Sequence, residues 1–215
     1  EDGECDFVSQ IAGEMPSYVI AELLGIPLDD GRELYKLTEA IHAAPESQEP
    51  GAGGMAVLKM FEYGRKVIDE KRAHPKDDLA TKLLMAEVDG KKLDDIEFLL
   101  FFLLLVDAGG DTTRNLLSAG LIALLENPDQ LAWLKGDLAA RLPCAREELL
   151  RYTTPVIYMR RTARQDVVLA GERIKEGDKV VMYFGSANRD PQKFDRPDML
   201  DLSRAPNEHI AFGTG

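Results

Sequence analysis

One short stretch near the middle of the chain combines residues that can transfer protons with an opening in the side-chain surface. It reads Ala108-Gly109-Gly110-Asp111-Thr112-Thr113. The two glycines lack side chains, so a flat molecule can approach the backbone there. The carboxylate of Asp111 and the hydroxyl of Thr112 can exchange protons beside that opening. The stretch therefore predicts a place where a flat ligand meets a proton relay.

The same stretch also has a purely structural interpretation. Glycines allow two helices to cross closely, and a buried Asp can be satisfied by neighbouring donors. The hydroxyl of Thr112 could likewise donate to the carbonyl oxygen of Ala108, four residues earlier. The stretch alone leaves both interpretations open.

We expect a long helix over residues 93–127 to position this stretch. Asp94 and Glu97 have the spacing of a capping box at its start, and Asn127-Pro128 ends it. Nine consecutive apolar residues, 98–106, follow the cap. Because the helix is apolar on every side, we expect it to be buried on every side and to form an axis for the other elements.

Further helices are predicted on both sides of this axis, and strands only near the end of the chain. The expected helices are two short ones in residues 5–25, then 31–44, 55–74, one that starts at 79 behind the cap Asp78, 129–135 and 143–152. Residues 45–54 are predicted to be a mobile loop and 191–207 an irregular meander. The expected strands are 156–163, 167–169 and 180–184.

This order of elements predicts a mainly α fold of the α+β class, with a small antiparallel sheet. We expect one domain over residues 1–215. Its helical part covers about 1–152, and its strand and meander part covers about 153–215.

The composition excludes several classes of protein. The 215 residues carry a net charge of −12, which argues against a nucleic-acid partner. No apolar run reaches the roughly 20 residues that span a bilayer, and the acidic start does not resemble a signal peptide. Cys5 and Cys144 form neither a disulfide framework nor a zinc-binding spacing. We therefore expect a cytoplasmic protein without a membrane partner.

Three other motifs are weak when each is taken alone. Glu148 and Arg151 share a helix face and could form a buried ion pair or a surface pair. Arg160 and Arg161 point to opposite faces of a strand, so one could face an anion, although two solvated charges are the simpler interpretation. The segment 209–215 has two glycines after Phe212, which is typical of a tight loop that passes close to a ligand.

Taken in this order, the motifs resemble the cytochrome P450 superfamily of haem-thiolate monooxygenases, in its bacterial soluble branch. The resemblance extends from about Cys5 to the last residue. Among bacterial members, the chain is most similar in character to actinobacterial enzymes that hydroxylate steroids and branched lipids. The residues that carry the resemblance are 108–113, 148–151, 161–163, 186–191 and 209–215.

The resemblance implies a P450-like helical core and a haem b cofactor with its iron. It implies that Ala108 and Gly109 lie against the face of the haem. Thr112 would hold dioxygen there, and Asp111 would supply protons toward it.

The resemblance also implies that residues of the strand and meander part contact the haem. By resemblance, Arg161 would bind a haem propionate. Ala211, Phe212 and Gly213 would begin the loop beneath the haem.

Further positions acquire roles in the same way. Glu148 and Arg151 would lock their helix to the meander, and Leu104, Asp107 and Val156 would line the substrate pocket. Asp107 is unusual, because the family places an apolar residue there. Either it receives a polar group of the substrate or extends the proton relay, or it pairs with a basic residue from a neighbouring helix.

The chain departs from the family pattern in three respects. The family's iron ligand is a Cys in Phe-Gly-x-Gly-x-His-x-Cys-x-Gly, and the present sequence supplies only Phe212 to Gly215. No metal ligand is therefore expected within the chain, and the axial Cys is expected beyond Gly215. The family's amino-terminal part is also missing, so we expect a fragment truncated at both ends. In the meander, Met199 occupies a position that usually holds Arg or His, so either Arg204 substitutes or the network is smaller.

The expected parent enzyme inserts one oxygen atom from O2 into a C–H bond of a small apolar substrate, such as a steroid, terpenoid or lipid. Electrons would come from NAD(P)H through a ferredoxin-type donor. The fragment alone is expected to be inactive, because the thiolate that drives O–O cleavage is absent. The alternatives are a non-catalytic helical module that binds an apolar ligand, or an inactive truncated product.

Overall fold

The structure is a computed structural model that describes residues 3–213. The chain divides into two compact units, Glu1–Asn115 and Leu116–Gly215. The mainly α fold with small antiparallel sheets is confirmed. Whether the two units form a single domain stays a prediction.

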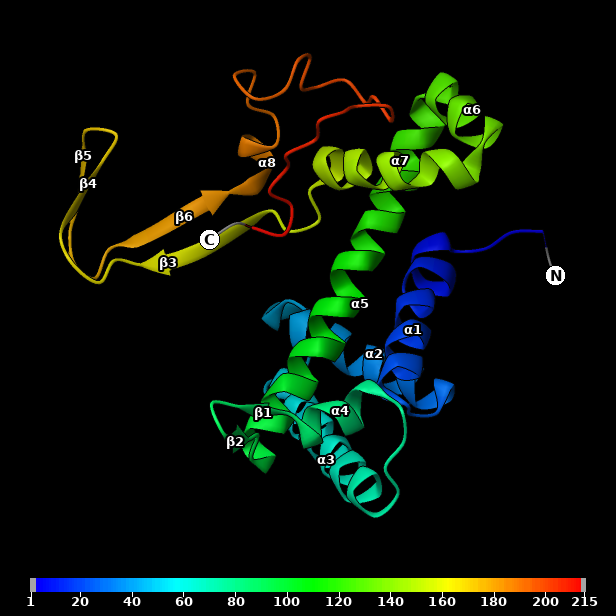
Figure 1. The fold of residues 1–215 in the computed structure, drawn as a ribbon, viewed down its shortest axis with the longest axis vertical. Helices are drawn as coiled ribbons and strands as arrows, with labels where there is room; N and C mark the ends of the chain where they lie inside the picture. Colours follow the sequence, from blue (N-terminus) through cyan, green and yellow to red (C-terminus); the bar gives the residue numbers. More distant parts are fainter. Residues whose placement is uncertain (1–2, 214–215) are drawn as a thin grey trace. The chain divides into compact units, whose positions relative to one another are not determined.

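Unit 1 is almost entirely helical (Figure 1). Its elements are a π-helical turn at Val8–Ala12, α1 (Glu14–Leu24), α2 (Leu28–His42), a 3-10 turn at Pro45–Ser47, α3 (Ala52–Ala73), α4 (Leu79–Met85), the hairpin of β1 (Glu87–Val88) and β2 (Lys91–Lys92), and the first two-thirds of α5 (Asp95–Glu126). Helix α3 begins at Ala52, so the predicted loop over 45–54 is shorter than expected.

The start of α5 has the predicted capping box. The backbone N–H of Asp94 donates to Oε2 of Glu97 over 2.9 Å, and the N–H of Glu97 donates to Oδ1 of Asp94 over 2.8 Å. The cap of α4 is also confirmed, since Oδ1 of Asp78 accepts from the N–H of Thr81. These contacts are local, and the sequence spacing is enough to specify them.

The core of unit 1 covers only one side of α5. Phe98, Phe102 and Val106 are buried against α1, α2, α3 and α4 residues. On the same helix, Leu100 and Leu104 are 53% and 56% exposed. The prediction that α5 is buried on every side is therefore wrong for the described chain, because the helices of unit 1 cover one face and leave the other open.

A buried lysine joins three segments of unit 1. The Nζ of Lys71 on α3 donates to Oδ2 of Asp78 over 2.7 Å and to the carbonyl oxygen of Gly25 over 2.6 Å. The side chain of Lys71 is fully buried. Gly25 ends α1 with φ +67°, and a Cβ there would lie 2.1 Å from Oδ2 of Asp78. Glycine is needed at this position for both its conformation and its space.

Unit 2 contains the end of α5 and all the longer strands. Its other elements are α6 (Pro128–Gly136), α7 (Leu138–Thr153), β3 (Tyr158–Thr162), β4 (Val167–Leu169), β5 (Glu172–Ile174), β6 (Lys179–Tyr183) and α8 (Phe184–Ala187). Strands β3 and β6 pair antiparallel with Tyr158 opposite Tyr183, and β4 and β5 form a separate hairpin. The chain after α8 is irregular, as predicted. A small core forms around Ala123, Leu134, Ala145, Leu200 and Leu202.

Several predicted boundaries in unit 2 are wrong. Helix α7 begins at Leu138 rather than 143, because the side chain of Asp137 caps it by accepting from the N–H of Ala140. Pro143 therefore lies inside the helix, where it has no N–H to donate to the carbonyl oxygen four residues earlier. Strand β3 is shorter than expected, Phe184 begins α8 instead of ending a strand, and β5 was not predicted.

Candidate functional site

In unit 1, the predicted proton-relay stretch lies within α5. The hydroxyl of Thr112 donates to the carbonyl oxygen of Ala108 over 2.7 Å, as its spacing predicted. Ala108 and Leu104 are on the exposed side of the helix. This open face could receive a flat or apolar ligand, and the hydroxyl of Thr112 lies along it.

The glycines of the stretch serve the covered side of α5. A Cβ added to Gly109 would lie 2.5 Å from Cδ1 of Ile20 on α1, and the nearest group to Gly110 is the ring of Tyr35 on α2. The crossing of helices thus gives Gly109 a structural reason to be glycine. Its contact with haem stays a prediction.

Asp111 is engaged by two donors. Its Oδ1 accepts from Nη2 of Arg114, and its Oδ2 accepts from Nδ2 of Asn115 over 3.2 Å. Arg114 also donates to Glu39 and, over 3.1 Å, to the hydroxyl of Tyr35, both on α2. Both carboxylate oxygens act as acceptors, so Oδ1 must separate from Arg114 before Asp111 can relay a proton.

Asp107 has a basic partner on a neighbouring helix. Its Oδ1 lies 2.7 Å from Nε2 of His42 at the end of α2. The pair is partly exposed, with 51% of the His42 side chain and 29% of the Asp107 side chain accessible. This contact agrees with the second interpretation of Asp107, a paired acid. A role in a substrate pocket, for Asp107 as for Leu104 and Val156, stays a prediction.

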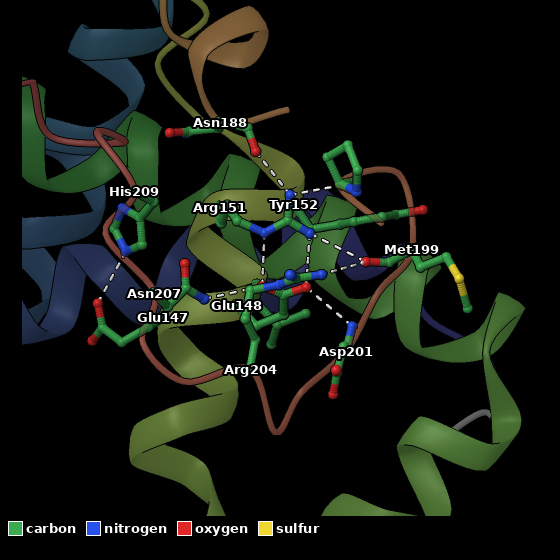
Figure 2. Close-up of polar contacts among 12 residues, drawn as sticks. Glu147, Glu148, Arg151, Tyr152, Asn188, Met199, Asp201, Arg204, Asn207 and His209 are labelled. Carbon is green, nitrogen blue, oxygen red and sulfur yellow. Dashed lines mark hydrogen bonds and ion pairs between the residues drawn. The ribbon is translucent and has the colours of Figure 1, made fainter. Parts of the chain in front are cut away.

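In unit 2, Glu148 and Arg151 form the predicted ion pair, and both side chains are fully buried. Nε and Nη2 of Arg151 donate to the two carboxylate oxygens over 2.7 and 2.8 Å (Figure 2). The remaining N–H groups of Arg151 donate to the carbonyl oxygens of Asn188, Pro197 and Met199. Every donor of the guanidinium is used, which is what a buried charge requires.

The network includes Arg204, which the sequence offered as one of two alternatives. Nε of Arg204 donates to Oε2 of Glu148 over 3.0 Å, and Nδ2 of Asn207 donates to the same oxygen over 3.0 Å. Met199 contributes only its backbone carbonyl. Arg204 is therefore a second arginine bound to the buried carboxylate, as the first of the two alternatives requires.

Unit 2 also contains a large open cavity of about 1080 Å³. Its lining is apolar for the larger part and also includes the charged residues Arg161, Arg189 and Asp190. The lining residues include Met159, Arg161, Met182, Phe184, Ile210, Phe212 and Gly213.

Arg161 is the residue of the Arg160-Arg161 pair that faces this cavity. The two residues lie opposite Val181 and Val180 on β6, so their side chains alternate across the sheet. Within residues 3–213, no carboxylate lies within ion-pair distance of Arg161, whose Nη1 donates only to the carbonyl oxygen of Arg160. A guanidinium in this position can bind an anionic group of a ligand.

The predicted loop also lines the cavity. Ala211 is buried, Phe212 is 80% exposed, and Gly213 has φ +77°. The last two residues of this motif, Thr214 and Gly215, lie outside the described residues. Sequence reasoning missed the contact of His209 with Glu147, which carries no local signal because the two are 62 residues apart.

Within the described residues, no group of three or more His, Cys, Asp or Glu side chains is arranged to hold a metal ion. Cys5 is exposed, and the thiol of Cys144 faces the carbonyl oxygen of Arg204. Burial, followed by the negative charge of Glu148, raises the pKa of Cys144, so this thiol stays protonated. Between residues 3 and 213 there is also no helix with the length and apolarity needed to cross a membrane.

Comparisons with known proteins place these features in one family. The family described as Cytochrome P450 matches residues 142–215. Steroid C26-monooxygenase of Mycolicibacterium smegmatis is 39% identical over 212 residues, which cover 98% of this chain and 49% of that protein. The solved structure of Mycobacterium marinum cytochrome P450 CYP268A2 in complex with pseudoionone matches with a TM-score of 0.91 at 40% identity, covering 99% of this chain and 53% of that one. The chain belongs to the cytochrome P450 family.

Another relative of this P450 chain is the methyl-branched lipid omega-hydroxylase of Mycobacterium tuberculosis, which is 39% identical over 217 residues. That match covers 100% of this chain and 51% of the relative. The P450 chain thus spans about half the length of the curated relatives it matches.

The residues of unit 2 fit the cofactor that the P450 family implies. Haem is a flat apolar group with two carboxylates. The cavity offers an apolar lining, an exposed Phe212 ring and, in Arg161, a cation without a carboxylate partner among the described residues.

Proposed function

We propose that the full-length protein containing this chain is a haem-dependent monooxygenase. It would insert one oxygen atom from O2 into a C–H bond of an apolar substrate, a steroid, terpenoid or branched lipid. The observation that carries the proposal is the cavity of unit 2, where Arg161 and Phe212 meet an apolar lining in the segment that matches the P450 family. Two relatives named for steroid C26 and methyl-branched lipid hydroxylation support the substrate class.

Residues of unit 2 would hold the cofactor, haem b. When bound, the haem iron supplies the activation of O2 and the oxidation of the C–H bond. Arg161 would neutralise a propionate, and Phe212 and Gly213 would pack against the ring. Electrons would come from NAD(P)H through a ferredoxin-type donor, in the cytoplasm. Cys144 is not placed to hold the haem, because its thiol faces the carbonyl oxygen of Arg204.

Residues of unit 1 would handle protons. The hydroxyl of Thr112 rests on the carbonyl oxygen of Ala108 and can rotate to donate to a ligand on the open face of α5. Asp111 would accept protons from water and pass them on after its Oδ1 leaves Arg114.

The test is a spectrum of the purified full-length protein. We expect a reduced, CO-bound form with the red-shifted Soret band of thiolate-ligated haem, and a spin-state change on addition of a sterol or a methyl-branched fatty acid. A protein that takes up no haem but still binds these ligands would overturn the proposal in favour of a non-catalytic apolar-ligand module.

A further inference from the structure

Residues 209–213 form a turn beside the cavity of unit 2. Ile210, Phe212 and Gly213 line the cavity of unit 2, whereas Ala211 between them is buried. The N–H of Gly213 donates to the carbonyl oxygen of Ile210 over 2.9 Å, which closes a tight turn. What holds this turn determines how Phe212 faces the cavity.

The first attachment is the buried amide of Asn188, which directly follows α8. Oδ1 of Asn188, which is fully buried, accepts from the N–H of Ile210 over 2.8 Å. Nδ2 of Asn188 donates to the hydroxyl of Thr154 over 3.0 Å. The start of the turn is thereby tied to the end of α7.

The second attachment is the side chain of His209, which is 5% exposed. Its Nδ1 lies 3.2 Å from the backbone nitrogen of Ala211, and its Nε2 lies 3.0 Å from Oε2 of Glu147 on α7 (Figure 2). A backbone N–H can only donate, so Nδ1 must accept and carries no proton. The proton therefore lies on Nε2 and is donated to Glu147.

Glu147 is suited to this acceptor role. Hydrogen bonds from Arg146 and, to a smaller extent, from His209 hold the pKa of Glu147 below its usual range, so it is a carboxylate at neutral pH. A carboxylate on Nε2 fixes both the tautomer and the ring orientation of a histidine. The ring in turn presents Nδ1 to Ala211.

We propose that Glu147 and His209 form a positioning pair that sets the cavity-lining turn through the N–H of Ala211. The effect of this pair on a bound haem rests on the proposed function. The pair and the turn themselves consist only of contacts within this chain. Neither residue is assigned contact with haem or substrate. Their role is to hold the turn in the shape that presents Phe212 and Gly213.

The experiment uses the full-length protein, haem-loaded, reduced and CO-bound, in which the iron is diamagnetic. Nitrogen-15 NMR reads the tautomer of His209, and hydrogen exchange reads the N–H of Ala211. We expect a protonated Nε2 and a bare Nδ1. In Glu147→Ala and His209→Phe, the protection of Ala211 should fall about five- to tenfold, the factor for the loss of one hydrogen bond.

Two further variants separate positioning from general destabilisation. Glu147→Gln keeps an oxygen that can accept from Nε2, so it should restore most of the protection. Glu208→Ala removes an exposed neighbouring carboxylate and should leave Ala211 unchanged. A proton on Nδ1 in the wild type would overturn the proposal. An equal loss of Ala211 protection in Glu147→Ala and Glu208→Ala would also overturn it.

Haem loss to a scavenging protein is measured on the same samples. It should be several-fold faster in Glu147→Ala than in Glu208→Ala, and equal rates would refute the effect on the cavity. If the wild type bound no haem, the proposed function would fail, whereas exchange of Ala211 in the apoprotein would still decide the inference.

Discussion

Lys71 donates a hydrogen bond to Oδ2 of Asp78 over 2.7 Å, although the lysine side chain is completely buried. Replacing it by methionine would leave the carboxylate of Asp78 buried and unpaired. We expect Lys71→Met to lower the free energy of unfolding of the full-length protein by about 3–5 kcal/mol, measured by urea denaturation.

The effect of pH checks the cause of this loss. Burial opposes ionisation of Asp78, but hydrogen bonds from Lys71 and Thr81 outweigh it, and the pKa of Asp78 is lowered from its usual value. The wild type therefore loses this stabilisation only as the pH falls through that lowered pKa. In Lys71→Met the pKa should instead rise, so the difference in stability should narrow on acidification from about pH 7 to about pH 4. A difference independent of pH would refute this explanation.

The buried Glu148–Arg151 pair should contribute more to stability than the contact of Arg204 with Glu148. Glu148→Ala leaves Arg151 charged and buried, so it should cost about 3–5 kcal/mol of unfolding free energy. Arg204→Met leaves Glu148 with its contacts to Arg151 and Asn207, so it should cost about 1.5–3 kcal/mol. Equal losses in thermal or urea melts would show that Arg204 is as essential as the central pair.

Arg161 and Arg160 form a matched pair of test positions on one strand. Arg161→Leu should release haem about two- to fivefold faster from the full-length protein, the range for an exposed ion pair. Arg160→Leu removes the same charge from the other face of β3 and should leave haem loss unchanged. Faster loss in both variants would attribute the effect to net charge rather than to the cavity.

Thr112→Ala should separate oxygen chemistry from folding. It removes a hydroxyl that donates to Ala108, and alanine is a better helix former, so haem content and melting should be preserved. Less product per reductant consumed is expected, because a proton donor is lost. Thr113→Ala is the control and should keep the wild-type ratio of product formed to reductant consumed.

Asp111→Asn should slow turnover of the full-length protein, since an amide cannot relay protons.

Asp107 should behave as a paired surface acid. Because His42 is its partner, Asp107→Val should change stability by no more than about 1 kcal/mol, and a double variant with His42→Val should cost less than the two single changes together. Affinity for all apolar ligands should be unaltered. A loss confined to ligands with a hydrogen-bond donor or a positive charge would restore the substrate-binding interpretation.

The features that could be predicted from the sequence are those with short spacing. The capping box of Asp94 and Glu97, the cap at Asp78, the bond from Thr112 to Ala108 and the Glu148–Arg151 pair all join residues three or four apart. One helical turn brings such residues together wherever the helix lies. The order of elements predicted the mainly α fold with a small sheet, and strand alternation predicted that only one of Arg160 and Arg161 faces inward.

The features that could not be predicted depend on where distant segments return. Arg204 reaches Glu148 across 56 residues. Lys71 lies in a helix with many exposed charges, and only the approach of Gly25 and Asp78 buries it. The open face of α5 has the same origin, since an apolar sequence specifies a need for cover but not which segment provides it.

The span of these contacts also implies an order of events during synthesis. Helix α7 leaves the ribosome well before its partners are synthesised. Asn188 and Met199 follow Arg151 by 37 and 48 residues, and His209 follows Glu147 by 62 residues. Until then its charges remain hydrated, since burying them unpaired would be costly. The buried Glu148 and Arg151 therefore have all their partners only when translation has passed Asn207. A pause before that point would expose a hydrated α7 to proteases, whereas the Lys71–Asp78 contact of unit 1, only seven residues apart, would already be complete.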